Sequence, residues 1–188
     1  DSLPSRGLGD VYKRQAEQSG IPLCETIAGK GAIIHEHPAY VGGIGVTGSS
    51  SANAMAKSAD VILAIGTRLQ DFTTGSWTAF SADAKFISIN AARWDAVKHR
   101  ALSVVGDALE TMKELNLALT DWSAPKSWMA KGRIEMAAWN AIIDEKQKPT
   151  NAILPSYAQI IKIVHDNAND RDLVITAVSY THLTLPTT

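Results

Sequence analysis

The stretch Val61-Ile62-Leu63-Ala64-Ile65-Gly66-Thr67-Arg68 decides the fold of this 188-residue chain. A continuous apolar run ends there at a glycine that is followed by two polar residues. Such a run is typical of a parallel strand covered on both faces, with a functional loop at its carboxyl end. The stretch therefore predicts a strand of a parallel sheet and, directly after it, a loop that is a candidate site.

The same pattern recurs on both sides of this strand. It is repeated in Phe86-Ile87-Ser88-Ile89-Asn90 and, more weakly, in Leu102-Ser103-Val104-Val105. A third short apolar run covers residues 21–26 and follows a helix end that is closed by Gly20. Residues 52–59 contain small helix formers behind serine caps, so a helix is expected there between two strands. Strands that alternate with helices predict an α/β fold with a doubly wound parallel sheet.

Two further segments carry helix signals. Asp107 is placed to cap a helix, with Glu110 as its reciprocal partner and one apolar face. Residues 128–146 predict a linker helix that wraps the domain surface, and residues 155–167 predict an amphipathic helix that opens a second unit. Residues 172–177 would be the first strand of that unit.

The loop from Tyr40 to Gly48 has four glycines within seven residues, which require tight turns or a close approach of the backbone. Glycine turns can cradle a phosphate with backbone N–H groups. However, no Gly-x-Gly-x-x-Gly follows a strand here, so glycines required by loop geometry are the favoured interpretation.

The two ends lack the periodicity of the interior. Residues 1–15 show neither helical nor strand spacing, and residues 178–188 interrupt a strand that has just begun. Both ends resemble the translated ends of sequencing adapters, so we expect them to be non-native and assign them no function. The expected organisation is a tail (1–15), a central domain (16–122), a linker helix (123–149), the start of a further domain (150–177) and a tail (178–188).

Composition excludes several classes of protein. Eighteen Lys and Arg face 19 Asp and Glu, so the chain lacks the basic charge of a nucleic-acid or membrane-surface binder. No run approaches the length of a membrane span, and we expect a cytoplasmic protein. The single cysteine, Cys24, is expected to pack as a small hydrophobe.

Two polar groups invite a functional interpretation. In His35-Glu36-His37 the spacing does not suit metal ligation, so a solvated loop is favoured over a zinc site. Arg68 and the run Asp71-Phe72-Thr73-Thr74 lie at the carboxyl edge of a strand, where α/β sheets bind ligands. An ordinary polar loop is the alternative there, and His99 with Arg100 is expected to be a solvated helix end.

The order of the motifs resembles one family. The chain is similar to the central domain of thiamine-diphosphate enzymes related to acetolactate synthase, over about residues 16–119. The similarity is carried by Ile21-Pro22, Thr26, Gly29-Lys30-Gly31, His37-Pro38, Gly42-Gly43-Ile44-Gly45, Ala59-Asp60-Val61, Gly66-Thr67-Arg68, Ile87-Ser88-Ile89-Asn90 and Val105-Gly106-Asp107-Ala108.

Within this family the chain most resembles the branch that hydrolyses trihydroxycyclohexane-1,2-dione in myo-inositol catabolism. This resemblance rests on residues 43–48, 71–74, 86–90, 95–101 and 138–140. An acetolactate-synthase-like or sulfoacetaldehyde-acetyltransferase-like enzyme is the alternative within the family. A stand-alone nucleotide-binding module and a purely structural interaction domain are the alternatives outside it.

The resemblance implies a piece of an enzyme rather than a complete active site. It implies thiamine diphosphate and Mg²⁺ in the full-length protein, a small cyclic diketone as substrate, and assembly into dimers or tetramers. Flavin-containing relatives hold FAD through loops that match Gly29, Lys30, Gly31, Gly66, Thr67 and Arg68, which are the candidate cofactor-binding residues. In this branch we expect those loops to serve mainly architecture. We expect no catalytic residue and no metal ligand within the sequence, and we expect the first strand of the domain to lie upstream of Ala16.

Overall fold

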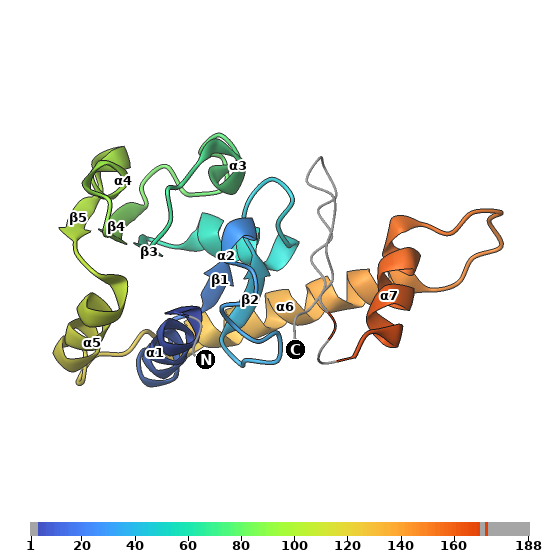
Figure 1. Cartoon of the computed structure of the whole chain (residues 1–188), viewed down its shortest axis with the longest axis horizontal. Helices are drawn as coiled ribbons and strands as arrows, with labels where there is room; N and C mark the ends of the chain where they lie inside the picture. Colours follow the sequence, from blue (N-terminus) through green and yellow to red (C-terminus); the bar gives the residue numbers. More distant parts are fainter. Residues whose placement is uncertain (1–3, 170–171, 173–188) are drawn as a thin grey trace.

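The computed structural model describes residues 4–169 and 172, and for residues 4–10 and 12 it describes the backbone alone. Two small parallel sheets and the helices around them form the chain (Figure 1). The strands are β1 (Leu23–Glu25), β2 (Tyr40–Gly43), β3 (Val61–Ile65), β4 (Lys85–Asn90) and β5 (Leu102–Val105). The helices are α1 (Pro4–Ser19), η1 (Ile27–Gly29), α2 (Ser50–Ser58), α3 (Asp71–Thr74), α4 (Arg93–Ala96), η2 (Lys98–Arg100), α5 (Ala108–Ala118), α6 (Lys126–Gln147) and α7 (Tyr157–Asn167).

The parallel sheet is divided into two parts. β1 pairs with β2, and β3, β4 and β5 pair in that order, with every pair parallel. Val61 lies opposite Lys85, and Ile87 lies opposite Leu102. The predicted α/β class with parallel strands is therefore confirmed, whereas the single doubly wound sheet is present as two separate pieces.

β2 was not expected as a strand. Its sequence Tyr40-Val41-Gly42-Gly43 contains two glycines, which weaken strand signals because they add conformational freedom and no side chain. The geometry explains the glycine at position 42, where φ is +101° and a Cβ would lie 2.1 Å from the Ser49 Oγ. The crowded turn after β2 confirms the prediction of a tightly constrained loop.

α1 corrects the expectation for the N-terminal residues. The stretch 1–15 lacks helical periodicity, yet residues from Pro4 onward are helical, and the helix ends at Gly20 with φ +66°. Gln15, Ala16 and Ser19 are buried at the end of this helix. Tertiary burial of that last turn overrides weak local signals. Whether residues 1–15 are native is a separate matter that stays a prediction.

α2 joins the two sheets. Its N-terminus is capped as predicted, because the Ser49 Oγ accepts a hydrogen bond from the Ala52 N–H at 3.1 Å. Met55 packs with Val41 of β2, whereas Ala56 packs with Ala64 of β3. One short helix therefore contributes to both hydrophobic clusters and holds the two sheets together.

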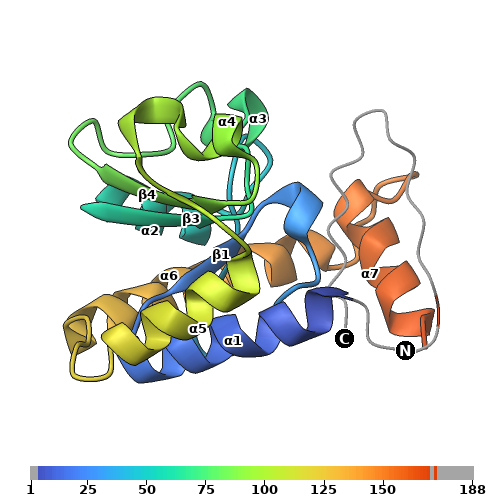
Figure 2. The same cartoon turned by 60° about the vertical axis from the view of Figure 1, so that its left-hand side comes forward.

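The strands are less covered than their apolar runs predicted. In β3 only Ala64 is buried and Val61 is 47% exposed, and all of β5 is exposed. A continuous apolar run predicts cover on both faces. That expectation is wrong for β5, which is the edge strand of its sheet and lies beside α4. Figure 2 shows α3 and α4 above β3 and β4.

α6 and α7 lead away from the sheets. α6 begins against α2 and β2, through contacts that include Trp128, and its far end carries α7 (Figure 1). The predicted helix at 155–167 is confirmed as α7, with Ser156 and Gln159 forming a capping box. The predicted strand at 172–177 lies outside the described residues except for Asp172. No described helix is long and apolar enough to span a membrane.

Candidate functional site

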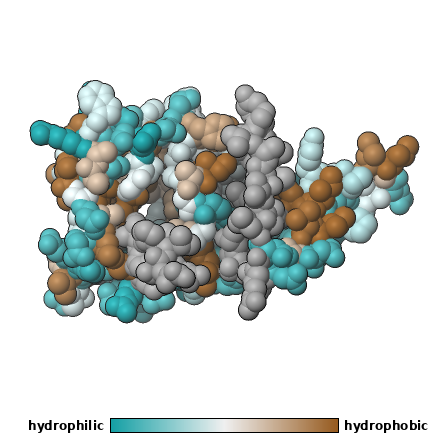
Figure 3. Space-filling view, viewed as in Figure 1, coloured by the Kyte–Doolittle hydropathy of each residue, from teal (hydrophilic) through white to brown (hydrophobic). Residues whose placement is uncertain are grey.

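A cavity of about 660 Å³ lies between the two sheets. β1 and β3 form its walls, and residues of α1 and α2 line it as well. Figure 3 shows a hollow in the surface of the sheet-bearing part of the molecule. Apolar side chains such as Ile21, Leu23, Ile44 and Val61 provide much of the lining, and polar groups gather at the carboxyl ends of the strands. We call this cavity the inter-sheet groove.

The first predicted cofactor loop, Gly29-Lys30-Gly31, is held by hydrogen bonds within the protein. The Gly29 N–H donates to the Thr26 carbonyl at 3.0 Å, and the Lys30 N–H donates to the Ile27 carbonyl at 3.4 Å. The Gly31 N–H donates to a carboxylate oxygen of Glu25 at 3.1 Å. Each of these backbone donors is therefore engaged inside the loop rather than directed at a ligand.

The carboxylate of Glu25 holds this loop through hydrogen bonds. It is buried, and its Oε1 also accepts the Ile33 N–H at 2.8 Å. Its Oε2 lies 3.7 Å from the Lys30 Nζ, which donates to the Tyr40 hydroxyl at 3.1 Å. Burial, and then the negative charge of Glu25, raise the pKa of the Tyr40 hydroxyl well above its usual value. Tyr40 therefore stays neutral and serves as a hydrogen-bond partner.

The second predicted loop, Gly66-Thr67-Arg68, closes the end of β3. Gly66 has φ +63°, and its N–H donates to the Ile89 carbonyl at 2.9 Å. The Asn90 side chain donates to the Thr67 carbonyl at 3.2 Å and accepts the Ala92 N–H at 2.9 Å. A Cβ built on Gly66 meets nothing within 4 Å, so this loop has open space beside it.

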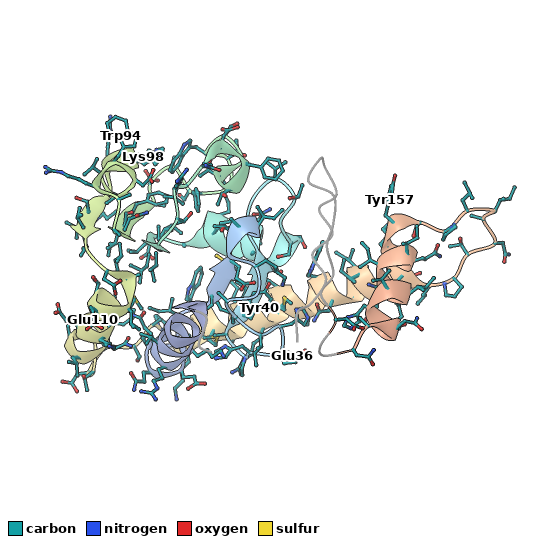
Figure 4. All side chains as sticks on the ribbon, viewed as in Figure 1. Glu36, Tyr40, Trp94, Lys98, Glu110 and Tyr157 are labelled. Carbon is teal, nitrogen blue, oxygen red and sulfur yellow. The ribbon has the colours of Figure 1, made fainter. Side chains whose placement is uncertain are left out.

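Arg68 pairs with a carboxylate of α4, the short helix that follows β4. Its Nε lies 3.5 Å from Asp95, and Asp95 also pairs with the Lys98 Nζ at 2.6 Å. Figure 4 shows Lys98 next to Trp94 at one end of the molecule, well away from Tyr40. The two predicted loops therefore have separate charge partners, Glu25 for Lys30 and Asp95 for Arg68.

The structure brings some of the candidate residues together. Gly29, Gly66, Thr67 and Arg68 line the inter-sheet groove, whereas Lys30 and Gly31 do not. Asp71 begins the single turn α3, in which Thr73 and Thr74 are buried and therefore serve packing. Of that predicted polar run, only Thr73 reaches the groove lining.

Cys24 was expected to pack as a buried hydrophobe, and this is only half correct. Its side chain is accessible to solvent, because it lines the groove. Protein atoms nevertheless surround it. Burial, and then the charge of Glu25, raise the pKa of the Cys24 thiol to about 11. The thiol is therefore protonated and weakly nucleophilic at neutral pH.

His37 corrects the interpretation of His35-Glu36-His37 as a solvated loop. His37 is buried, its Nδ1 accepts the Ala39 N–H at 3.2 Å, and its Nε2 lies 3.6 Å from Glu17 of α1. The loop folds back onto α1, which sequence spacing does not reveal. Within residues 4–169 and 172, no group of three or more His, Cys, Asp or Glu side chains is placed to hold a metal ion.

An aromatic cluster on the second sheet was missed at the level of sequence. The rings of Trp77, Phe80 and Phe86 contact one another, with the Trp77 centroid 5.7 Å from Phe80 and 5.4 Å from Phe86. The His99 ring lies 3.9 Å from Trp77 at a tilt of 46°. Partial desolvation, and then the charge of Lys98, lower the pKa of His99. His99 and Arg100 are exposed at the end of η2, as expected of a solvated helix end, and the contact of the His99 ring with Trp77 is the feature that the sequence did not predict.

Comparison with known proteins identifies the family to which this architecture is similar. The family model described as the central domain of thiamine pyrophosphate enzymes matches residues 5–115. Curated relatives bear the name 3D-(3,5/4)-trihydroxycyclohexane-1,2-dione hydrolase. A Clostridium perfringens relative is 45% identical over 112 residues, which is 59% of this chain and 18% of the relative.

Two further relatives have the same name. One from Geobacillus thermodenitrificans is 45% identical over 113 residues, which is 60% of this chain and 18% of the relative. One from Listeria monocytogenes is 47% identical over 100 residues, which is 53% of this chain and 16% of the relative. The chain thus corresponds to less than a fifth of the length of these relatives. With parallel strands, flanking helices and a family match over more than half of its length, the chain belongs to the central-domain family of thiamine pyrophosphate enzymes.

Proposed function

We propose that this chain is the structural central domain of a thiamine-diphosphate-dependent hydrolase that cleaves a carbon–carbon bond of trihydroxycyclohexane-1,2-dione. The observation that carries the proposal is the 45% identity, over 112 residues, with relatives named for that hydrolysis. An acetolactate-synthase-like or sulfoacetaldehyde-acetyltransferase-like activity is the alternative within the family.

The described residues do not fit a bound Mg²⁺ ion. No group of three or more acidic, His or Cys side chains is placed among them to bind Mg²⁺. Thiamine diphosphate supplies an electron sink for bond cleavage when an enzyme holds it. We propose that the ligands of the cofactor and the catalytic groups belong to other domains of the full-length protein.

The role that we assign to this chain is positional. Glu25 fixes the loop after β1, and Asn90 links the ends of β3 and β4 by bonding to Thr67 and Ala92. Both features hold the carboxyl edges of the sheets in place, which is where α/β folds present binding loops. The engaged backbone donors of Gly29, Lys30 and Gly31 support an architectural use of that loop.

A second candidate function is nucleotide binding at the mouth of the inter-sheet groove. It is supported by the shared placement of Gly29, Gly66, Thr67 and Arg68 in one lining. Glycine-rich strand ends can bind phosphates through their backbone N–H groups.

The cytoplasmic location and the assembly into dimers or tetramers stay predictions. Size-exclusion chromatography with light scattering of the full-length protein would measure its oligomeric state.

The deciding experiment uses the full-length protein that contains this sequence, with thiamine diphosphate and Mg²⁺ added. Ring opening of trihydroxycyclohexane-1,2-dione is measured beside condensation of pyruvate. Ring opening that disappears when thiamine diphosphate is omitted would support the proposal. Acetolactate formation alone would keep the family and overturn the substrate. The 188-residue chain, tested in parallel, is expected to be inactive.

A further inference from the structure

β5 is the outer strand of the three-stranded sheet. Among the described strands it pairs with β4 alone, so its second edge has no strand beside it. All four residues of Leu102–Val105 are exposed, and Figure 1 shows the strand at one border of the molecule. An open edge presents N–H and C=O groups that can pair with a further strand.

The register with β4 identifies the backbone groups on this open edge. The N–H of Gly106, directly after β5, donates to the Asn90 carbonyl of β4 at 3.2 Å. Alternate residues of a strand direct their backbone groups to opposite neighbours, so Val104 faces β4 as well. The N–H and C=O groups of Ser103 and Val105 therefore lie on the open edge.

Apolar side chains extend this edge into a patch. Leu102 is 68% exposed, and Val104 and Val105 are exposed beside it. α4 packs beside β5, and Trp94 of α4 is 77% exposed and projects outward (Figure 4). Edge strands that must stay unpaired usually have a charge, a proline or a bulge, and β5 has neither a charged residue nor a proline and pairs in regular register. This edge therefore has the character of an interface.

The charges beside β5 have opposite signs at its two ends. The basic run Lys98-His99-Arg100 precedes the strand, and Asp107 and Glu110 follow it. Figure 4 shows Lys98 and Glu110 on opposite sides of β5. Lys98 and Glu110 pair with neighbours on their own helices or turns. Arg100 and Asp107 are exposed, and neither has an ion-pair partner in the part of the chain that the structure describes.

This arrangement of charge is complementary to itself. Arg100 stands two residues before β5 and Asp107 two residues after it. When such a strand pairs antiparallel with its own copy, the basic start of each strand lies beside the acidic end of the other. Parallel pairing would instead place like charges together, which is unfavourable. Two copies related by a twofold axis pair antiparallel, so the charges fit a second copy of this chain.

We propose that β5 is an interface between two copies of this chain, whose β5 strands pair antiparallel about a twofold axis and join two three-stranded sheets into one. Ser103 of each copy exchanges backbone hydrogen bonds with Val105 of the other, which uses every open-edge group of the strand and places Val104 opposite its own copy. Arg100 of each copy pairs with Asp107 of the other. The proposal does not depend on which reaction the full-length protein catalyses.

Disulfide cross-linking tests the register. The chain has one cysteine, so Cys24→Ser gives a background without thiols. Val104→Cys in that background places two thiols opposite each other, where Cα atoms lie about 4.5 Å apart and a disulfide can form. Leu117→Cys is the control, because Leu117 on α5 is more exposed than Val104 but lies off the edge. On non-reducing gels, mild oxidation should give the covalent dimer at least tenfold faster with Val104→Cys. Equal rates would indicate random collision and overturn the proposal.

A matched pair of variants tests the backbone pairing. Ser103→Pro removes an N–H that faces the open edge and leaves the bonds to β4, whereas Ser103→Ala keeps that N–H. Analytical ultracentrifugation of the 188-residue chain should show a dimer that dissociates at least tenfold more readily with Ser103→Pro and is unchanged with Ser103→Ala. Equal dissociation of the two variants, with circular dichroism showing both folded, would exclude strand pairing at β5.

A charge reversal tests the ion pair without altering the strand. Arg100→Glu places two carboxylates together at each end of the paired strands, so it should weaken the dimer at least tenfold, and added salt should reduce that loss. Arg133→Glu on the exposed side of α6 makes the same change of charge away from β5 and should have no effect. Equal effects of the two reversals would overturn the pairing of Arg100 with Asp107. A monomer at every concentration, with β5 amides protected only in the full-length protein, would assign the edge to another domain and overturn the proposal.

Discussion

Single residues determine how the loops at the ends of the strands are held. Glu25 is the strongest case, because one buried carboxylate receives two backbone N–H groups and lies near the ammonium of Lys30. A buried acceptor of this kind stabilises a loop mainly through the cost of removing it, since its donors would be left unpaired.

We therefore expect Glu25→Ala to lower the free energy of unfolding of the chain by about 3 kcal/mol. Glu25→Gln keeps an acceptor oxygen and loses the ion pair, so its loss should be about half as large. Urea unfolding followed by circular dichroism measures both. Equal losses would show that the charge, rather than the hydrogen bonds to Gly31 and Ile33, holds the loop.

Two glycines with positive φ differ in the space that a Cβ would have, so their substitution separates backbone strain from steric clash. Gly45 has φ +122°, and a Cβ there would lie 2.6 Å from the Phe72 carbonyl oxygen. Gly45→Ala should cost about 3 kcal/mol because strain and a clash with backbone add together. Gly66 has a positive φ but open space, so Gly66→Ala should cost about 1 kcal/mol. A reversed order in urea unfolding would contradict the geometry of the two loops.

The thiol of Cys24 should show its environment in a pH titration. Its pKa is raised to about 11 in the folded chain, against 9.0 for an ordinary thiol. Alkylation by iodoacetamide should therefore rise with a midpoint near pH 11 in the native chain and near pH 9 in urea. Because the folded state disfavours the thiolate, this group's contribution to stability is present below pH 9 and is lost as the pH rises toward 11. A native midpoint near 9 would place the thiol in open solvent.

At the scale of elements, the helix caps were the most predictable features. Ser49 and Asp107 cap α2 and α5 as their sequences indicate. The expected reciprocal bond from Glu110 does not form, because its carboxylate pairs with Lys113 at 2.7 Å instead. Cap geometry depends on neighbours within one turn and is therefore readable locally, whereas the partner of a long exposed side chain is not.

α7 offers an element that should open without disturbing the sheets. It packs on the end of α6, and Tyr157 on its exposed side projects away from the sheets (Figure 4). Ser156→Ala removes the side-chain half of the capping box and should destabilise α7 by about 1 kcal/mol. Hydrogen exchange should speed up in α7 alone, while amides of β3 and β4 keep their rates. Faster exchange in β4 would indicate that α7 supports the sheets.

At the scale of the whole molecule, the division of the sheet governs stability. Among the described strands, β4 has a neighbour on each side, whereas β1 and β3 each pair on one side only. In the 188-residue chain, amides of β4 should therefore exchange at least tenfold more slowly than amides of β1. Uniform protection across both sheets, measured by mass spectrometry, would mean that the groove is filled by another part of the chain.

The sequence by itself determined the α/β class, the three strands at 61–65, 86–90 and 102–105, the helix caps and the family. Apolar runs, caps and glycine turns depend on neighbours a few residues apart, and the order of the motifs adds the family resemblance. Tertiary structure decided the helix over the N-terminal residues, the strand at 40–43, the burial of His37 and the contact of the His99 ring with Trp77. The same holds for the groove between β1 and β3, because strand order and the closure of a sheet depend on contacts between residues far apart in the chain, which local patterns do not encode.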